Sequence, residues 1–169
     1  MTIRAGNQDE LKTLQEIERS AGRAFVEIGM VEIAADEPLS EDRLREYCEA
    51  QRLWVYDDGE GKVVAYLVAD VLDGCAHIEQ VSVHAAFAGR RLGRALIEHL
   101  VQWARLSGLA GVTLTTFADV PWNARYYVTC GFTTIAPEQL GPELRAVRAR
   151  EAKQGLDRWP RVAMYRGLD

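Results

Sequence analysis

Hydrophobic residues recur every three to four positions in several stretches of the chain, and this spacing predicts amphipathic helices. The clearest repeat begins at Leu92 and continues to Ala104, with Gly108 placed where a helix C-terminus favours glycine. Asn7 and Glu10 resemble a capping box before another such repeat, and Ser40 precedes a third. The predicted helices cover residues 7–20, 40–50, 92–104, 121–129 and 142–153.

Apolar runs of strand length alternate with these helices. Gly-containing turns separate the three runs between residues 53 and 83, which predicts an antiparallel meander. Residues 22–39 have weak periodicity and contain Gly29 and Pro38, so we expect an irregular or short helical flap there. The predicted strands cover residues 2–5, 53–56, 63–71, 77–83, 112–116, 132–136 and 161–166. We therefore expect an α/β (α+β) fold with a mixed, mostly antiparallel central sheet and helices on both faces.

Composition narrows the class of protein. The 169 residues are 48% hydrophobic and 27% charged, which fits one globular domain over residues 1–169 and excludes a disordered chain. No apolar run approaches the roughly 18 residues of a membrane-spanning helix, and no signal-peptide core follows the N-terminus. We therefore expect a cytoplasmic protein without membrane contact. The net charge of −5 argues against nucleic acid as a partner.

Positive charge gathers where the strand predicted at 77–83 leads into the helix predicted from Leu92. Gly89 lies in the connecting loop, and Arg90, Arg91 and Arg94 lie in or beside it. Unpaired N–H groups and the positive dipole end of a helix N-terminus favour a phosphate or pyrophosphate at such a position. The segment has neither Walker A nor GxGxxG spacing, so nucleotide hydrolysis and dinucleotide binding lose support. A solvated basic helix start is the alternative interpretation.

A second motif covers residues 123–132, where a short helix with paired tyrosines ends at Gly-Phe and enters a strand. Together the two motifs resemble the GNAT (Gcn5-related) N-acetyltransferase superfamily. That family's loop pattern is Gln/Arg-x-x-Gly-x-Gly/Ala, for which this chain has Ala88, Arg91 and Gly93, so two of three positions differ. The Asn-…-Tyr-x-x-x-Gly-Phe ending matches well, with Tyr127 four residues before the glycine.

The resemblance implies acetyl-CoA as cosubstrate, no metal, and a splayed parallel pair formed by strands 77–83 and 112–116. It also implies that loop amides hold the pyrophosphate and that backbone N–H groups of the first strand hold the pantetheine and the thioester carbonyl. For Asn123, starting its helix is an equally open role. The cofactor-binding residues implied are Val81, Ser82, Val83, Gly89, Arg90, Arg91, Leu92, Gly93, Arg94 and Asn123.

Acetyl transfer to an amine needs a neutral nitrogen, a stabilised oxyanion and a proton for the departing thiolate. A tyrosine hydroxyl, with a pKa of about 10, is close to a thiol of about 8.5, so Tyr127 is the expected general acid. Its alternative role is core packing. Glu79 lies on the strand before the loop and is the candidate base, with a surface carboxylate as the alternative. Three unpaired cysteines (Cys48, Cys75 and Cys130) need no role in direct attack.

We thus expect an acetyl-CoA-dependent N-acetyltransferase that modifies a primary amine of a small molecule or peptide. The alternative is a catalytically weak CoA-binding regulatory module. The sequence names no acceptor and leaves the oligomeric state open, with a homodimer as one option. From Glu27 to Glu49 the chain has eight acidic residues against Arg43 and Arg45, a formal charge of −6. In a cleft this charge favours a cationic acceptor, and a solvated helix face is the alternative.

Overall fold

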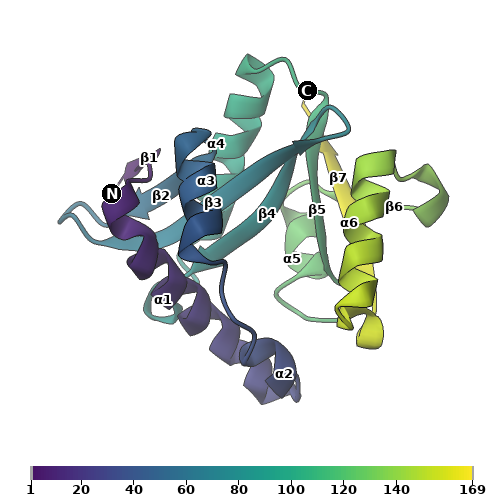
Figure 1. Ribbon diagram of the computed structural model, residues 1–169, viewed down its shortest axis with the longest axis horizontal. Helices are drawn as coiled ribbons and strands as arrows, with labels where there is room; N and C mark the ends of the chain where they lie inside the picture. The colour runs from purple at the N-terminus through teal and green to yellow at the C-terminus, as the bar shows by residue number, and fades with distance from the viewer. Residues whose placement is uncertain (1, 169) are drawn as a thin grey trace. The chain divides into compact units, whose positions relative to one another are not determined.

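A computed structural model describes residues 2–168, which form a seven-stranded mixed sheet with helices packed against it (Figure 1). The strand order is β1-β2-β3-β4-β5-β7-β6. The strands are β1 (Thr2–Ala5), β2 (Leu53–Asp57), β3 (Val63–Leu72), β4 (Cys75–Val83), β5 (Gly111–Phe117), β6 (Thr133–Ile135) and β7 (Arg161–Gly167). The α-helices are α1 (Leu11–Gly22), α2 (Val31–Ala34), α3 (Glu41–Glu49), α4 (Leu92–Leu106), α5 (Ala124–Thr129) and α6 (Pro142–Lys153).

The chain forms two compact units. The N-terminal unit comprises the residues up to Ala69 together with Glu79–His99, and the C-terminal unit comprises Asp70–Ile78 together with the residues from Leu100 onward. Strands β3 and β4 and helix α4 each contribute a part to both units. The expectation of a single domain over residues 1–169 stays a prediction.

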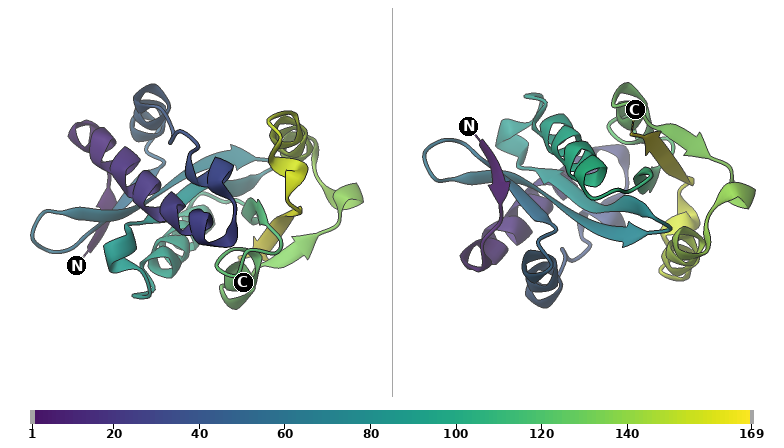
Figure 2. Two further views of the ribbon diagram at one scale, coloured as in Figure 1. Left: turned by 90° about the horizontal axis from the view of Figure 1, so that it is seen from below. Right: turned by 90° about the horizontal axis from the view of Figure 1, so that it is seen from above.

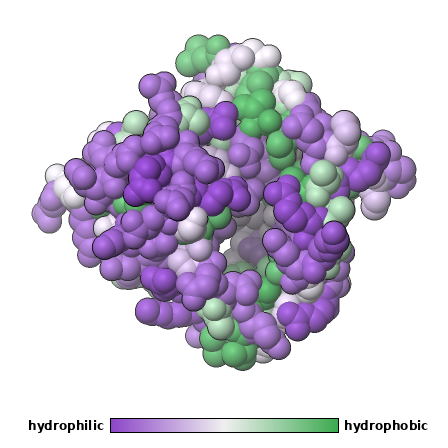
Figure 3. Space-filling view, in the orientation of Figure 1, coloured by the Kyte–Doolittle hydropathy of each residue, from purple (hydrophilic) through white to green (hydrophobic). Residues whose placement is uncertain are grey.

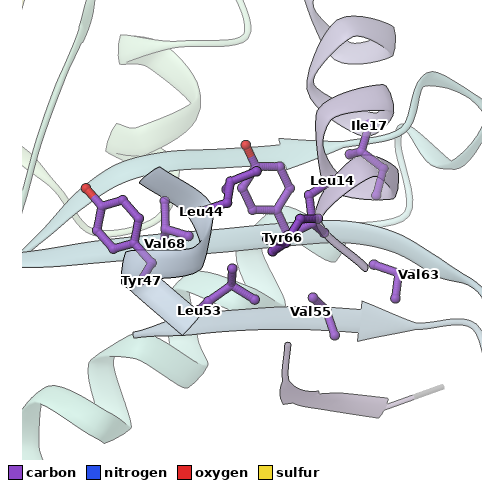
Figure 4. Packing of buried hydrophobic residues seen from close by; sticks show 10 residues of the cluster. Leu14, Ile17, Leu44, Tyr47, Leu53, Val55, Val63, Tyr66 and Val68 are labelled. Atoms are coloured by element: carbon purple, nitrogen blue, oxygen red, sulfur yellow. The ribbon is translucent and has the colours of Figure 1, made fainter. Parts of the chain in front are cut away.

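The core of the N-terminal unit lies where α1 and α3 cover one face of β2 and β3. Leu14 of α1 and Leu44 of α3 are fully buried against Val55 and Tyr66 (Figure 4). Trp54, the next residue to Val55 on β2, instead makes an edge contact with the His99 ring of α4, at 6.0 Å between centroids. Because neighbouring strand residues point to opposite faces, α4 covers the other face of β2.

In the C-terminal unit, β4 and β5 form the parallel pair, with Ala76 opposite Val112. β5 and β6 each pair antiparallel with β7. Both views of Figure 2 show α6 beside β7, where Leu144 and Val147 are buried with Ala163. Asp73 in the β3–β4 turn fixes the start of α6, because its carboxylate accepts hydrogen bonds from the amides of the helix's first turn.

Most of the predicted elements are confirmed, including the meander, the parallel pair and the long helix that begins at Leu92. The Ser40 hydroxyl accepts a hydrogen bond from the Arg43 amide (3.1 Å), as a helix cap should. The predicted flap holds a 3-10 turn at Arg23–Ile28 followed by α2. The start predicted for the helix at 121–129 is wrong, because Asn123 has a non-helical backbone and α5 begins only after it.

Candidate functional site

The junction between β4 and α4 presents a run of backbone amides without a protein acceptor. We call residues Ala88–Gly93 the anion loop. In the described part of the chain, Arg90 closes the turn at Ala88–Gly89, and the amides of residues 91 to 94 donate no hydrogen bond. The Ala95 amide donates to the Arg91 carbonyl (3.0 Å). The left-handed backbone of Gly89 (φ 79°) and Arg91 (φ 62°) turns the chain twice within the loop. Such a run of N–H groups at a helix N-terminus can bind an anion with several charged oxygens.

Exposed cations surround the anion loop. The Arg90 guanidinium lies 4.9 Å from the centre of the Phe87 ring, and the Lys62 ammonium lies 5.8 Å from it. A ring face attracts cations, so Phe87 holds both positive charges beside the loop. The His84 ring accepts a hydrogen bond from the Ala86 amide (3.1 Å). His84 therefore shapes the turn before the loop.

The residues predicted on β4 divide between its two faces. The Gln80 side chain donates a hydrogen bond to the Ser82 hydroxyl (2.8 Å), and Ser82 is 4% exposed. Since residues two apart on a strand share a face, Glu79, Val81 and Val83 lie on the opposite face from this pair, as strand alternation predicts. The Ser82 hydroxyl accepts this bond and keeps its own O–H as a donor.

Tyr127 lies half-buried on α5 within a small group of aromatic rings. Its ring makes edge contacts with Tyr126 (5.4 Å between centroids) and Phe132 (5.9 Å). Burial raises the pKa of Tyr127, and Tyr126 and Cys130 raise it further. The hydroxyl is therefore fully protonated at neutral pH, but it is a weaker acid than the free side chain, so the close pKa match to a thiol expected from the sequence does not hold.

Asn123 begins α5 through its backbone. Its carbonyl accepts a hydrogen bond from the Tyr127 amide (3.0 Å), whereas its side chain makes no capping hydrogen bond. The structure therefore supports the helix-start role for its backbone.

Sequence reasoning missed a hydrogen-bonded pair in the N-terminal unit. The hydroxyl of Tyr66, a residue with no exposed surface, donates to Glu18 Oε1 at 2.5 Å. Burial raises the pKa of Glu18, although the hydrogen bonds from Tyr66 and from the Leu39 amide oppose that shift. Burial also raises the pKa of Tyr66, and the negative charges of Glu18 and Glu79 add to this effect. Two carboxylates therefore act on one buried hydroxyl.

Ser20 is a second missed residue. It is 3% exposed, and its hydroxyl accepts a hydrogen bond from the Ala85 amide (3.0 Å), in the turn that leads to the anion loop. A serine three positions after Ile17, on the apolar side of the predicted helix, is the signal that could have found it.

The N-terminal unit holds most of the predicted site residues: Glu79, Val81, Ser82, Val83, Gly89, Arg90, Arg91, Leu92, Gly93 and Arg94. Tyr127 and Asn123 belong to the C-terminal unit. Among residues 2–168, no group of three or more His, Cys, Asp or Glu side chains could hold a metal ion. Within the same residues, no helix has both the length and the apolar composition needed to cross a membrane.

The chain belongs to the acetyltransferase (GNAT) family, whose model matches residues 13–132. Rv2747 from Mycobacterium tuberculosis, solved in complex with CoA and NLQ, is 20% identical, with a TM-score of 0.71 and all of both chains covered. Ard1 from Thermoplasma volcanium is 18% identical, with a TM-score of 0.71 and 99% and 97% of the two chains covered. The ribosomal-protein-S18-alanine N-acetyltransferase from Escherichia coli is 20% identical, with a TM-score of 0.68 and 99% and 94% covered. These structures share the fold of this chain.

Proposed function

We propose that the protein is an acetyl-CoA-dependent N-acetyltransferase that transfers the acetyl group to a primary amine of a small molecule or a peptide by direct attack in a ternary complex. The observation that carries the proposal is the row of unpaired amides, residues 91 to 94, at the start of α4 in a GNAT-family chain. A row of this kind suits a pyrophosphate, which has charged oxygens along its length. CoA in the related M. tuberculosis structure supports the same ligand.

The residues of this chain fit acetyl-CoA, which supplies the acetyl group as a thioester. The amides of residues 91 to 94 would hold the pyrophosphate, and the exposed Arg90, Arg91 and Arg94 would add positive charge. The backbone of Val81–Val83 would hold the pantetheine, and the Asn123 side chain is free of a capping role and can do the same. The free thiols of Cys48, Cys75 and Cys130 suit the reducing cytoplasm.

Two side chains would handle the protons of the reaction. An amine acceptor arrives as an ammonium ion, and Glu79 would remove its proton, directly or through a water molecule. Tyr127 would donate a hydrogen bond to the departing sulfur and transfer its proton late in the step. Among residues 2–168 the structure gives the Tyr127 hydroxyl no hydrogen-bond partner, which leaves it available for this role.

The decisive experiment combines a binding assay and a turnover assay. The melting temperature should rise with CoA and acetyl-CoA, since a ligand specific to the folded state stabilises it. It should rise less with pantetheine, which has no phosphate groups for the anion loop to bind. Thiol release from acetyl-CoA should then be measured across a panel of amines. Binding without thiol release would favour the CoA-binding regulatory module, and no melting shift at millimolar acetyl-CoA would overturn the proposal.

Substitutions separate the two catalytic roles. Tyr127→Phe should keep the CoA-induced melting shift and lower kcat by roughly ten- to a thousandfold, the range for losing one proton donor. Tyr126→Phe is the matched control and should retain activity. Glu79→Gln should shift the rising limb of the pH–rate profile. Wild-type turnover by Tyr127→Phe, or an unchanged profile for Glu79→Gln, would remove that residue from the mechanism.

The flap, residues 22–39, suggests the character of the acceptor. Val26, Ile28 and Val31 are 52%, 41% and 55% exposed, and hydrophobic surface lies at the lower edge of Figure 3, over this segment. Glu27 and Glu32 are exposed among them. The acidic charge of the flap favours an amine-bearing acceptor over an acidic one.

The acceptor preference can be tested with salt. The kcat/KM for a polyamine or aminoglycoside should exceed that for a peptide with an N-terminal Asp or Glu. Because screening weakens attraction between exposed charges, the preference should fall between about 0.05 and 0.5 M salt. A preference for acidic acceptors, or one that ignores salt, would show that the flap charge does not select the acceptor.

A further inference from the structure

The middle of α1 holds the flap at the point where the flap returns to the body of the N-terminal unit. The Gln15 side chain donates to the Leu39 carbonyl (3.0 Å), and the Leu39 amide donates to Glu18 Oε1 (3.3 Å). Both backbone groups of Leu39 are thus bound by side chains of one helix. The flap leaves α1 after Gly22 and is bound to α1 again at its last residue.

Glu18 connects this anchor to the strand next to β4. The Glu18 oxygen that binds the Leu39 amide also accepts the Tyr66 hydroxyl of β3. The Tyr66 ring is fixed in the core with Leu14 and Leu44 (Figure 4), so the hydroxyl has little freedom to move. Glu79, the proposed base, contributes its charge to the same hydroxyl. The end of the flap is therefore tied through Glu18 to a buried hydroxyl of β3.

Ser20, two residues further along α1, makes the corresponding contact on the side of the anion loop. Its buried hydroxyl accepts the Ala85 amide, and Ala85 opens the 3-10 turn Ala85–Phe87 that precedes the loop. Phe87 in that turn holds Arg90 and Lys62 over its ring. One helix therefore fixes the segment proposed to receive the acceptor through Glu18 and the loop proposed to receive acetyl-CoA through Ser20.

We infer that Glu18 and Ser20 are positioning residues that set the two substrate affinities separately, Glu18 for the acceptor amine and Ser20 for acetyl-CoA. The inference rests on the proposed function, because it assigns one substrate to each side of α1. Neither residue touches a reacting atom. Glu18 acts through its hydrogen bonds with Leu39 and Tyr66, and Ser20 acts through its hydrogen bond with Ala85. If the two side chains only stabilised α1, replacing either one would change the KM values for both substrates together.

The test is a pair of KM measurements on each variant. Glu18→Ala should raise the KM for the acceptor roughly five- to twentyfold and leave the KM for acetyl-CoA unchanged, since it removes one hydrogen-bonded anchor. Glu18→Gln should restore most of the affinity, because its amide oxygen can accept the same two hydrogen bonds. Tyr66→Phe keeps the hydrogen bond from the Leu39 amide to Glu18, so it should raise the acceptor KM less than Glu18→Ala does. Glu16→Ala, an exposed glutamate on the same helix, is the matched control and should change neither constant.

Ser20→Ala should show the opposite pattern, with a higher KM for acetyl-CoA, a smaller CoA-induced melting shift and an unchanged KM for the acceptor. Hydrogen exchange gives a readout that needs no turnover. Exchange should accelerate in residues 22–39 of Glu18→Ala and in residues 85–93 of Ser20→Ala. Each variant should leave exchange in the other segment unchanged.

The outcomes separate this inference from the proposed function. Absence of thiol release by the wild type would overturn the proposed function, and the exchange pattern would still decide the two positioning roles. Equal changes of both KM values in either variant, or exchange that accelerates in both segments together, would overturn the inference.

Discussion

Arg91 offers a quantitative test of the anion loop, because it is an L-residue in the left-handed backbone region (φ 62°). That conformation costs a non-glycine residue about 1–2 kcal/mol, whereas glycine adopts it freely and loses about 0.5–1 kcal/mol more chain entropy on folding. The net gain of Arg91→Gly over Arg91→Ala should therefore be about 0.5–1 kcal/mol. For a chain of this size that corresponds to roughly 1–4 °C in Tm.

The comparison with Arg91→Ala matters because both variants remove the exposed guanidinium, and only glycine relieves the backbone. Arg90, the preceding residue, has no positive φ and supplies the control, since Arg90→Gly should be less stable than Arg90→Ala. Thermal and urea unfolding without acetyl-CoA would measure all four variants. If Arg91→Gly is no more stable than Arg91→Ala, the left-handed geometry of the loop, and the turn that aligns its amides, would be refuted.

Two further predictions concern the C-terminal unit. Asp73→Ala should lower the free energy of unfolding, measured in urea, by about 1–2 kcal/mol. The reason is that the Asp73 carboxylate accepts hydrogen bonds from the amides of Glu143 (3.0 Å) and Leu144 (2.9 Å). An unchanged free energy of unfolding would mean that these bonds do not stabilise α6. Burial lowers the pKa of His77, so the folded state binds a proton less readily than the unfolded state, and stability should fall as the pH drops below about 6.5. Melting between pH 8 and 5 should show a flatter decline for His77→Gln, and parallel curves would contradict this account.

The elements that the sequence predicts well are those fixed by local spacing. The repeat from Leu92 to Ala104 encodes α4 because each apolar residue is placed by neighbours within two turns. The same holds for the β2–β3–β4 meander, whose turns contain glycines with positive φ such as Gly59 and Gly74. Both motifs of the candidate site could be found in this way, since each lies within one short segment.

The missed residues depend on contacts between distant segments. Glu18 and Tyr66 are 48 positions apart, and only the docking of α1 on the sheet brings the carboxylate to the hydroxyl. Lys62 lies just before β3 and Phe87 lies after β4, so their contact depends on how these two strands pair. Local periodicity does not encode that pairing. The pKa of Tyr127 follows from burial among Tyr126, Cys130 and their neighbours, so the sequence could supply the tyrosine but not its acidity.

The closed ends of the flap have a consequence for how acceptor choice can diverge. Since α1 carries the departure point at Gly22 and also holds the return point at Leu39, the intervening chain is a loop on a fixed base. Doubling the length of such a loop costs only about 0.6 kcal/mol in closure entropy. Residues between these ends can thus be lengthened, shortened or replaced while the sheet and the anion loop keep their geometry. Under the proposed function, in which the flap receives the acceptor, substrate range could change through this insert without changes to the residues proposed to bind acetyl-CoA.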